Sequence, residues 1–328
     1  MYTEFSRLRK LDTVCGIAGR IAGPDGQVGA DLVELMQAQR HRGSDSTGFG
    51  IYGPPRQRGY VVRMVGGDRS VVESSVERFA VASRAGGADL IEDPTWDDLN
   101  QPHVSVRAVV DDPARPFADW LSAVDHLPGL EIQSVGRSLE IIKDLGNAYS
   151  VAEAHGVREL AGTHGLANAR MATESLVSPT ASHPFWARPF PDVAIVHNGQ
   201  LTNYYLLKER LIRAGYDFKT ENDSELIAVW VADQMAQGMT LEGALELSKS
   251  ALDGVFTYIL ATADQLVFAK DRWAIKPLAV VEESDGGLAL ATEEQALRRL
   301  FVDEVEVLNY DGPRQSRLWP VAGLAVPA

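Results

Sequence analysis

The single cysteine of this 328-residue chain, Cys15, begins a segment that is more polar and richer in glycine than its apolar neighbours require. Four other segments share this character, and the five are residues 15–19 (CGIAG), 41–50 (HRGSDSTGFG), 168–175 (NARMATES), 197–204 (HNGQLTNY) and 222–225 (NDSE). A cysteine thiolate is a nucleophile, a guanidinium binds carboxylates in a bidentate manner, and amide groups stabilise oxyanions. These residue types suit nucleophilic attack on a carbonyl group.

Each segment taken singly also has a purely structural interpretation. A lone cysteine is most often a small buried apolar residue. Residues 41–48 could form a turn, and the Asn198-Gly199 pair suits the end of a strand because both residues tolerate left-handed backbone geometry. Asp223 could cap a helix whose first turn holds Glu225, an interpretation that is compatible with a functional role. No single segment decides between structure and chemistry.

The elements expected around these segments alternate between strands and helices. Apolar runs predict strands at residues 15–21, 49–52, 60–65, 166–171, 193–197, 255–261, 265–269, 278–281 and 288–291. Apolar stripes at helical spacing predict a helix capped by Asp31 and helices at residues 202–214, 224–235 and 241–252. Helices gathered between strand-rich stretches indicate an α+β fold and not a doubly wound parallel sheet.

Residues 66–160 carry no catalytic signature, and we expect them to form an inserted subdomain. A polar stretch at 84–100 precedes the expected elements, which are a strand at 103–110, a helix at 117–126, a strand at 130–133 and a helix at 138–145. The role predicted for this insertion is packing or contact with a partner protein.

Charge and composition exclude several classes of function. Lysine and arginine number 31 against 45 acidic residues, and the net charge of −14 opposes binding to nucleic acid. No apolar run approaches the ~18 residues of a membrane helix, and residues 1–14 lack the apolar stretch of a secretory signal. One cysteine cannot form an internal disulfide, and the seven histidines show no metal-ligand spacing. We therefore expect a cytoplasmic protein without a metal, a membrane or a nucleic-acid partner.

Taken together and in this order, the five segments resemble the glutaminase domain of class II glutamine amidotransferases, which are N-terminal-nucleophile hydrolases. The family's Cys-Gly-Ile start, RGxDSxG, (H/G)xRxAT, HNG and (T/N)D(T/S)E patterns are matched by residues 15–17, 42–48, 168–173, 197–199 and 222–225. Residues 270–278 (KDRWAIKPL) are similar to the family's RDxxGxxPL element. The resemblance covers residues 15–65 and 162–300. It implies a four-layer αββα sandwich over residues 15–310, with the insertion at about 66–160 and a C-terminal tail at 311–328.

The resemblance also implies how such a site would hydrolyse the side-chain amide of L-glutamine. Cys15 would be the nucleophile and its own α-amine the general base, because a free N-terminal amine has a pKa of about 7.7–8.0. The side-chain amide of Asn198 and the backbone N–H of Gly199 would form the oxyanion hole, whose donors typically contribute about 2.7–4 kcal/mol each.

Four further residues are expected to serve the substrate. Arg170 would pair with the α-carboxylate in a bidentate geometry that a lysine cannot provide. Asp223 would bind the α-ammonium group, and Thr173 would line the same pocket. Arg42 is expected near the nucleophile, where it supports the loop, or else in an ion pair with Asp45.

The sequence departs from the family pattern at two places. Cys15 is not the second residue, so residues 1–14 must be removed after Val14 before the nucleophile has a free α-amine. Glu174 occupies a position where the family often has histidine.

The activity expected on this basis needs a second protein. Too few residues follow Phe301 to hold a synthase domain, so we expect the ammonia to pass to a separate subunit. Residues 171–175 (MATES) resemble the small amidotransferase subunits related to glutamate synthase and N-methylglutamate synthase. That resemblance implies an FMN-dependent synthase subunit and a further glutamate-synthase-like subunit as partners, with FMN on the partner and no cofactor on this chain.

Two other functions stay open at the level of sequence. One is a stand-alone N-terminal-nucleophile amidase or γ-glutamyl-transferring enzyme. The other is a catalytically silent regulatory subunit, in which an uncleaved segment 1–14 blocks the site.

Overall fold

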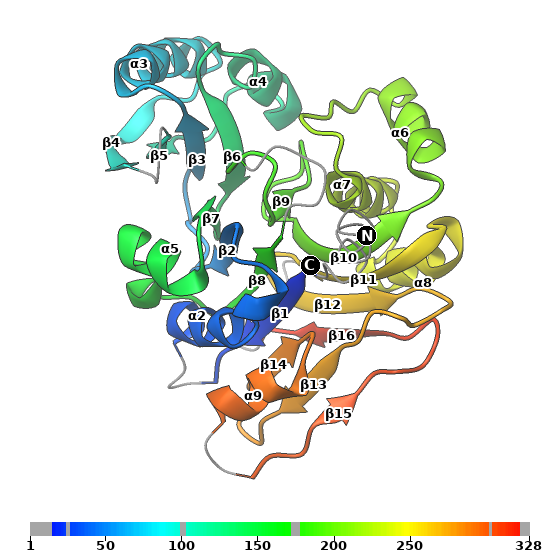
Figure 1. Ribbon diagram of the computed structural model, residues 1–328. Helices are drawn as coiled ribbons and strands as arrows, with labels where there is room; N and C mark the ends of the chain where they lie inside the picture. Colours follow the sequence, from blue (N-terminus) through cyan, green and yellow to red (C-terminus); the bar gives the residue numbers. More distant parts are fainter. Residues whose placement is uncertain (1–14, 24–26, 99–102, 172–177, 302–303, 322–328) are drawn as a thin grey trace, which may run out of the picture.

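The strands of this chain are distributed over three sheets, two of which form the main body (Figure 1). The computed structural model describes residues 15–23, 27–98, 103–171, 178–301 and 304–321. The seven-stranded sheet has the order β15 (Leu308–Asn309), β13 (Ala279–Glu282), β14 (Leu288–Ala291), β1 (Gly16–Ile21), β8 (His164–Arg170), β2 (Ser46–Tyr52), β7 (Leu139–Leu145). The five-stranded sheet has the order β16 (Ser316–Pro320), β12 (Gln265–Lys270), β11 (Gly254–Ala261), β10 (Ala194–Leu201), β9 (Phe185–Trp186). Neighbouring strands in both sheets run antiparallel.

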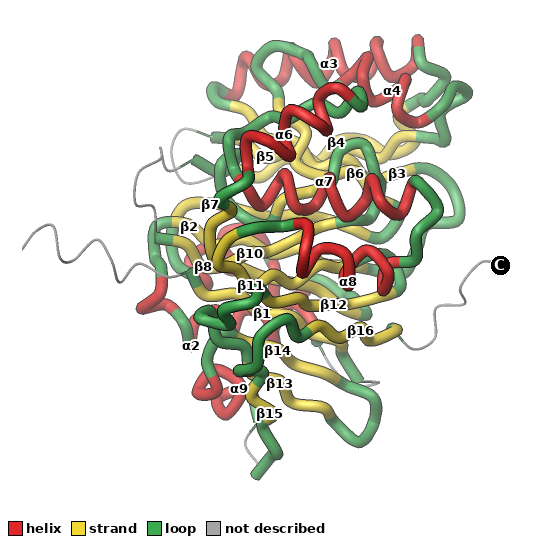
Figure 2. The backbone as a smooth tube through the Cα atoms, turned by 90° about the vertical axis from the view of Figure 1, so that its right-hand side faces the viewer, coloured by secondary structure: helices red, strands yellow, loops and turns green. Residues whose placement is uncertain are grey.

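Helices cover the outer faces of these two sheets. The seven-stranded sheet packs against α2 (Val28–Ala38), α5 (Ala148–His155) and α9 (Glu294–Leu300) through one apolar cluster. The five-stranded sheet packs against α6 (Tyr204–Arg213), α7 (Asp223–Ala236) and α8 (Leu241–Ala251) through another, and Figure 2 shows α7 and α8 over its strands. Two short 3₁₀ turns, η2 (Arg40–Arg42) and η3 (Val157–Glu159), join elements of the first group. The prediction of an α+β fold is confirmed.

The inner faces of the two sheets share a third apolar cluster. Ile17 of β1 and Leu166 of β8 are fully buried in it together with Val196 of β10 and Ile259 of β11. Because side chains alternate between the two faces of a strand, every second residue of these strands points into the space between the sheets. Polar residues at the ends of the strands therefore come close to one another there. This contact positions the candidate site described below.

A four-stranded sheet and two helices form the inserted part at the top of Figure 1. Its strands are β4 (Leu90–Asp98), β5 (Val104–Val110), β3 (Tyr60–Gly66) and β6 (Glu131–Gly136), and its helices are α3 (Arg69–Ala85) and α4 (Phe117–Val124). The chain then returns to the main body through β7 and α5. The inserted sheet therefore runs from Tyr60 to Gly136, a shorter and earlier span than the expected 66–160.

The helix predicted at residues 138–145 is wrong, because this segment is strand β7. It pairs with β2 over its whole length, with Phe49 opposite Ile142. Ile141 and Ile142 are β-branched and buried, and Lys143 and Asp144 are buried as well. A strand buried on both faces shows no alternation, so its apolar residues mimicked a helical spacing.

Several helices and strands were not predicted, although the sequence of some of them contains recognisable capping residues or apolar stripes. Asp68 caps α3 by accepting hydrogen bonds from two backbone N–H groups, and Val72, Val76 and Phe79 form its buried stripe. Strand β4 lies within the stretch that appeared merely polar. Strand β16 lies within the expected tail and pairs with β12 along the edge of the five-stranded sheet. Among the described helices, none combines the length and apolar character that a membrane crossing would need.

Candidate active site

A cavity of about 810 Å³ opens where β1 and β8 of one sheet meet β10 of the other. Five residues predicted to act on glutamine line it, namely Cys15, Arg170, Asn198, Gly199 and Asp223. They come from four separate parts of the sequence, and the fold brings them to one place. The described residues contain no group of three or more His, Cys, Asp or Glu side chains placed to hold a metal ion.

Strands β1 and β8 bring Cys15 and Arg170 together. The two strands pair antiparallel with Gly16 opposite Ala169, and Cys15 and Arg170 are the next residues outward on each strand. Arg170 is further held by its guanidinium, which donates a hydrogen bond to the carbonyl oxygen of Ala181. The nucleophile candidate and the carboxylate-binding candidate therefore sit side by side at the end of the sheet.

The loop before β2 supports the backbone of Arg170. A Cβ atom on Gly43 would lie 2.2 Å from the carbonyl carbon of Arg170, so only glycine fits at this contact. The backbone N–H of Asp45 donates to the carbonyl oxygen of Arg170 over 3.1 Å. The RGxDSxG pattern thus serves to fix the end of β8.

Asn198 and Gly199 lie near the end of β10 in the five-stranded sheet. The side-chain amide of Asn198 donates to the backbone carbonyl oxygen of Cys15 over 2.9 Å. Gly199 has φ of 144°, and a Cβ atom there would lie 1.9 Å from the carbonyl oxygen of Val255 on the neighbouring strand. The glycine lets β11 approach closely while β10 presents Asn198 to the cavity.

Asp223 is the first residue of α7 and also lines the cavity. Asn222 caps this helix by accepting a 2.9 Å hydrogen bond from the backbone N–H of Ser224. The Asp223 carboxylate accepts a 3.0 Å hydrogen bond from the backbone N–H of Leu201 and lies 3.4 Å from Nδ1 of His197. Burial alone would raise the pKa of Asp223, but its contact with His197 and the hydrogen bond from the Leu201 N–H lower it below its usual range. Asp223 is therefore an anion at neutral pH.

The environment of the Cys15 thiol combines burial with positive charge. Burial raises the pKa of Cys15 above its ordinary value, and the nearby charges of Arg170 and Lys276 oppose that rise. The backbone of Met171 and the nearby side chain of Asn168 also lower the pKa of the thiol. These groups favour the ionised form, which is the nucleophilic one.

Two predicted residues stand apart from the five. Arg42 is not among the described residues that line the cavity, and its guanidinium pairs with Glu293, which also lies 3.0 Å from His41. The ion pair joins η2 to the connection between β14 and α9. The partner of Arg42 in this pair is Glu293, whereas the sequence suggested Asp45. Thr173 lies outside the described residues, as does Glu174.

Sequence reasoning gave no role to Asn168 and Lys276, which also approach the thiol. Asn168 precedes Arg170 by two residues in β8, and side chains two apart point to the same face of a strand, so the period of two could have identified it. Lys276 lies in the segment 270–278 that resembles a family element, and it lines the cavity. Only the fold shows that this lysine reaches Cys15.

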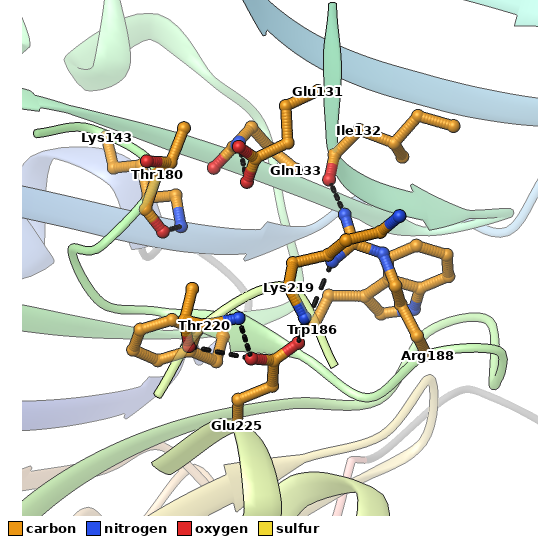
Figure 3. Close-up of a pocket in the computed structure, with 11 residues that line it drawn as sticks. Glu131, Ile132, Gln133, Lys143, Thr180, Trp186, Arg188, Lys219, Thr220 and Glu225 are labelled. Atoms are coloured by element: carbon orange, nitrogen blue, oxygen red, sulfur yellow. Dashed lines mark hydrogen bonds and ion pairs between the residues drawn. The ribbon is translucent and has the colours of Figure 1, made fainter. Parts of the chain in front are cut away.

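A second, much smaller cavity of about 10 Å³ lies behind the first turn of α7 (Figure 3). Glu225 lines one side of it, and its carboxylate accepts hydrogen bonds from the backbone N–H groups of Lys219 and Thr220 over 3.0 and 2.8 Å. Arg188 lies 3.8 Å from Glu225 and 3.3 Å from Asp125, the C-terminal cap of α4 in the insertion. This buried network joins the helix of the substrate cavity to the inserted part.

Lys143 of β7 also lines the small cavity and is fully buried among backbone carbonyl groups. Its Nζ donates to the carbonyl oxygen of Ser182 over 2.8 Å and lies 3.3 Å from that of Pro184. Burial lowers the pKa of Lys143 to about 7, although Glu131 opposes the shift. The lysine anchors the segment whose Ala181 carbonyl receives Arg170.

Two solved structures have a fold similar to that of this chain. Over 94% of this chain, the structure superposes on half of the glutamine phosphoribosylpyrophosphate amidotransferase from B. subtilis, with a TM-score of 0.57 and 15% identity. A second structure, the allosteric regulatory enzyme of purine biosynthesis, gives a TM-score of 0.55 at 16% identity, again over half of its chain. At these low sequence identities, the structural similarity shows a shared fold only.

Relatives in sequence define the family. Residues 168–299 match the family described as a glutamine amidotransferase domain. The chain is 33% identical to a protein named as a glutamine amidotransferase in Methanothermobacter thermautotrophicus, over 94% of this chain and 100% of that protein. It is 32% identical to the glutamine amidotransferase-like protein GlxB of Rhizobium meliloti, over 88% of this chain and 92% of GlxB. The chain belongs to the glutamine amidotransferase family, in its class II.

Proposed function

We propose that this chain is a glutaminase subunit that hydrolyses L-glutamine to glutamate and ammonia through a thioester on Cys15. The observation that carries the proposal is the cavity that Cys15, Arg170, Asn198 and Asp223 line together. A nucleophile, a cation for the α-carboxylate, an amide donor and an anion for the α-ammonium are the groups that this reaction requires. Thr173 would complete the substrate pocket.

The reaction begins with the Cys15 thiol, whose proton passes to the Cys15 α-amine as sulfur attacks the amide carbon of glutamine. The side-chain amide of Asn198 and the N–H of Gly199 donate to the oxygen that becomes negative. When the carbon–nitrogen bond breaks, the α-ammonium returns its proton to the departing nitrogen, and ammonia leaves. Water then attacks the thioester with the same amine as base, which releases glutamate and restores the thiol.

This mechanism depends on removal of residues 1–14. While Val14 remains attached, the nitrogen of Cys15 is an amide and cannot accept a proton. The catalytic domain would then begin at Cys15 and include strand β16, which belongs to its five-stranded sheet, with the inserted part at residues 60–136. The packing of helices on the outer faces of two facing sheets supports the four-layer αββα sandwich of N-terminal-nucleophile hydrolases for this domain.

The ammonia would pass to a synthase subunit of glutamate-synthase type that carries FMN, in a complex with a further glutamate-synthase-like subunit. Support comes from the resemblance of residues 171–175 to the small subunits of such complexes. A shielded transfer also keeps ammonia from being protonated in water. The inserted part, whose described residues hold no candidate catalytic cluster, is the surface that we propose for this contact.

The test is the intact mass of the protein before and after exposure to a diazo-ketone analogue of glutamine, with Cys15→Ala as the control. Loss of residues 1–14 and one adduct that Cys15→Ala lacks are expected, together with release of ammonia from L-glutamine. Full activity of a strict homo-oligomer, unchanged by any synthase subunit, would favour the stand-alone amidase. An unprocessed chain that is neither labelled nor active would refute the glutaminase and favour a silent regulatory subunit.

A further inference from the structure

The hydroxyl of Ser224 lies between two buried histidines. Its Oγ is 2.6 Å from Nε2 of His183 and 3.0 Å from Nδ1 of His197. The same Nδ1 of His197 lies 3.4 Å from the Asp223 carboxylate. His183, Ser224 and His197 thus form a series of polar contacts that ends at the Asp223 carboxylate. The second ring nitrogen of each histidine, Nδ1 of His183 and Nε2 of His197, has no hydrogen-bond partner among the described residues.

The positions of the protons in this series follow from the chemistry of its ends. A carboxylate only accepts hydrogen bonds, so the His197 nitrogen that faces Asp223 must carry its hydrogen. Ser224 Oγ then accepts from His197, and its own single hydrogen is directed to Nε2 of His183. Burial, reinforced by the positive charge of Arg170, holds the pKa of His183 well below its usual range, so this imidazole is neutral and can accept.

We propose that His183 and Ser224 are positioning residues that fix the tautomer of His197 and thereby hold the Asp223 carboxylate ready for the α-ammonium group of the substrate. The proposal rests on the proposed function and adds a determinant of selectivity for α-amino acids. His183 acts by accepting a hydrogen bond. Without this acceptor, Ser224 would turn its hydrogen to His197, which would then present a lone pair to Asp223.

The consequence concerns one end of the substrate only. Asp223 keeps the hydrogen bond from the Leu201 N–H in either tautomer, so its position at the start of α7 is retained. What changes is the support for its negative charge and the orientation of its second oxygen. Binding of the α-carboxylate by Arg170 and attack by Cys15 involve other groups and stay as they are.

The experiment compares ligands that differ only in the α-amino group. L-glutamate and glutarate are used as competitive inhibitors of ammonia release from L-glutamine by the processed enzyme. In His183→Phe, where the hydrogen of Ser224 turns to His197, we expect the inhibition constant of L-glutamate and the KM for L-glutamine to rise about tenfold, as loss of a hydrogen bond to a charged group predicts. The inhibition constant of glutarate and kcat are expected to change by less than about twofold. The double variant His183→Phe with Ser224→Ala also removes the hydrogen that would turn to His197, and it is the rescue variant.

A conservative variant tests whether His183 acts as an acceptor. His183→Gln can place an amide oxygen near the position of Nε2 and is expected to keep selectivity, whereas His183→Phe removes the acceptor and should lose it. Imidazole ¹⁵N spectra report which nitrogen of His197 carries hydrogen. We expect Nδ1–H in the unmodified protein and in Cys15→Ala, and Nε2–H in His183→Phe.

Each outcome decides one of the two proposals. Equal weakening of L-glutamate and glutarate in His183→Phe, or an Nε2–H tautomer of His197 in the unmodified protein, would overturn the positioning role. If the unmodified protein releases no ammonia from glutamine, the proposed function fails, while the ¹⁵N spectra still test the hydrogen-bond chain. Loss of the folded state in His183→Phe, seen in its thermal midpoint, transfers the test to His183→Gln and to the ¹⁵N spectra of the unmodified protein.

Discussion

The side-chain amide of Asn198 donates a 2.9 Å hydrogen bond to the backbone carbonyl oxygen of Cys15. Asn198 belongs to the five-stranded sheet, whereas Cys15 directly precedes β1 of the seven-stranded sheet. An amide nitrogen carries two hydrogens, so this contact leaves the second one for an acceptor in the cavity. One side chain therefore joins the two sheets and offers a donor beside the candidate nucleophile.

Replacing Asn198 by alanine is expected to lower kcat for glutamine hydrolysis by about 10²–10³, the usual loss for one oxyanion-hole donor. The KM should change much less, because the donor acts on charge that develops in the transition state. Steady-state ammonia release measures both quantities. Asn309→Ala, at an exposed site in β15, is the control and should behave as the unmodified enzyme. A rise in KM with unchanged kcat would assign Asn198 to substrate binding instead.

For Arg170, the informative substitution is Arg170→Lys. The charge stays, but the bidentate fork for a carboxylate and the hydrogen bond to Ala181 are lost, so we expect the KM for L-glutamine to rise about tenfold or more. Titration of Cys15→Ala with L-glutamate, with and without Arg170→Lys, gives the affinity without turnover. Arg272→Lys serves as the control because Arg272 is half exposed beside Asp253. Unchanged affinity would remove Arg170 from the carboxylate site.

The positive charge of Lys276 stabilises the Cys15 thiolate, so its removal should raise the pKa of the thiol. Burial already raises this pKa, and Lys276 is one of the two cations that oppose the rise. In Lys276→Met, the pH at which iodoacetamide alkylation of Cys15 reaches half its maximal rate is expected to move upward. Lys249→Met, on α8 beside Glu246, should leave that midpoint unchanged. A downward movement would contradict the assigned electrostatics.

The imidazole of His155 couples the main body to the inserted part. Its Nε2 lies 3.2 Å from the buried Asp144, and its Nδ1 lies 3.7 Å from Asp97 of β4. Burial lowers the pKa of His155, but the hydrogen bonds and charges of the two aspartates outweigh it, and the pKa is raised above its usual value.

A raised pKa in the folded state means that protonation of His155 stabilises the fold. This stabilisation is complete below the unfolded pKa of about 6.5 and disappears as the pH rises through the higher folded value. His155→Gln is therefore expected to lower the free energy of unfolding by about 1–3 kcal/mol at pH 6 and by less at pH 9. Urea unfolding at both pH values measures this. His126→Gln, at an exposed histidine, is the control, and equal losses at both pH values would refute the charge-based account.

Local pattern was sufficient for the strands that carry the site and insufficient for β7. The apolar runs that end in polar residues identified β1, β8 and β10, because the polar residues at their ends differ sharply from their apolar interiors. In β7, Lys143 and Asp144 are as buried as Ile142, so polarity does not report which face is inside. The position of β7 follows from its pairing with β2, which lies about ninety residues earlier and leaves no mark on the segment itself.

Some residues of the candidate site can also be predicted from local sequence pattern, whereas others depend on contacts between distant segments. Cys15, Arg170, Asn198 and Asp223 were predicted because each lies in a short polar segment, and the five segments together resemble those of a known family. No role was predicted for His183 from the sequence, and only its 2.6 Å contact with Ser224, 41 residues later in the chain, links it to the cavity. Contacts of this kind depend on how two sheets and a helix pack, and spacing along the sequence does not encode them.

The first turn of α7 faces three environments with three consecutive residues. Asp223 faces the cavity, Ser224 the histidines and Glu225 the charged network of the insertion. Each residue of a helix is rotated by about 100° from the one before it. Inserting or deleting one residue just before Asp223 would move all three side chains to the wrong neighbours at once. The length of the connection at residues 219–222 is therefore set by three separate environments at once, because it fixes the rotation of α7 relative to all of them.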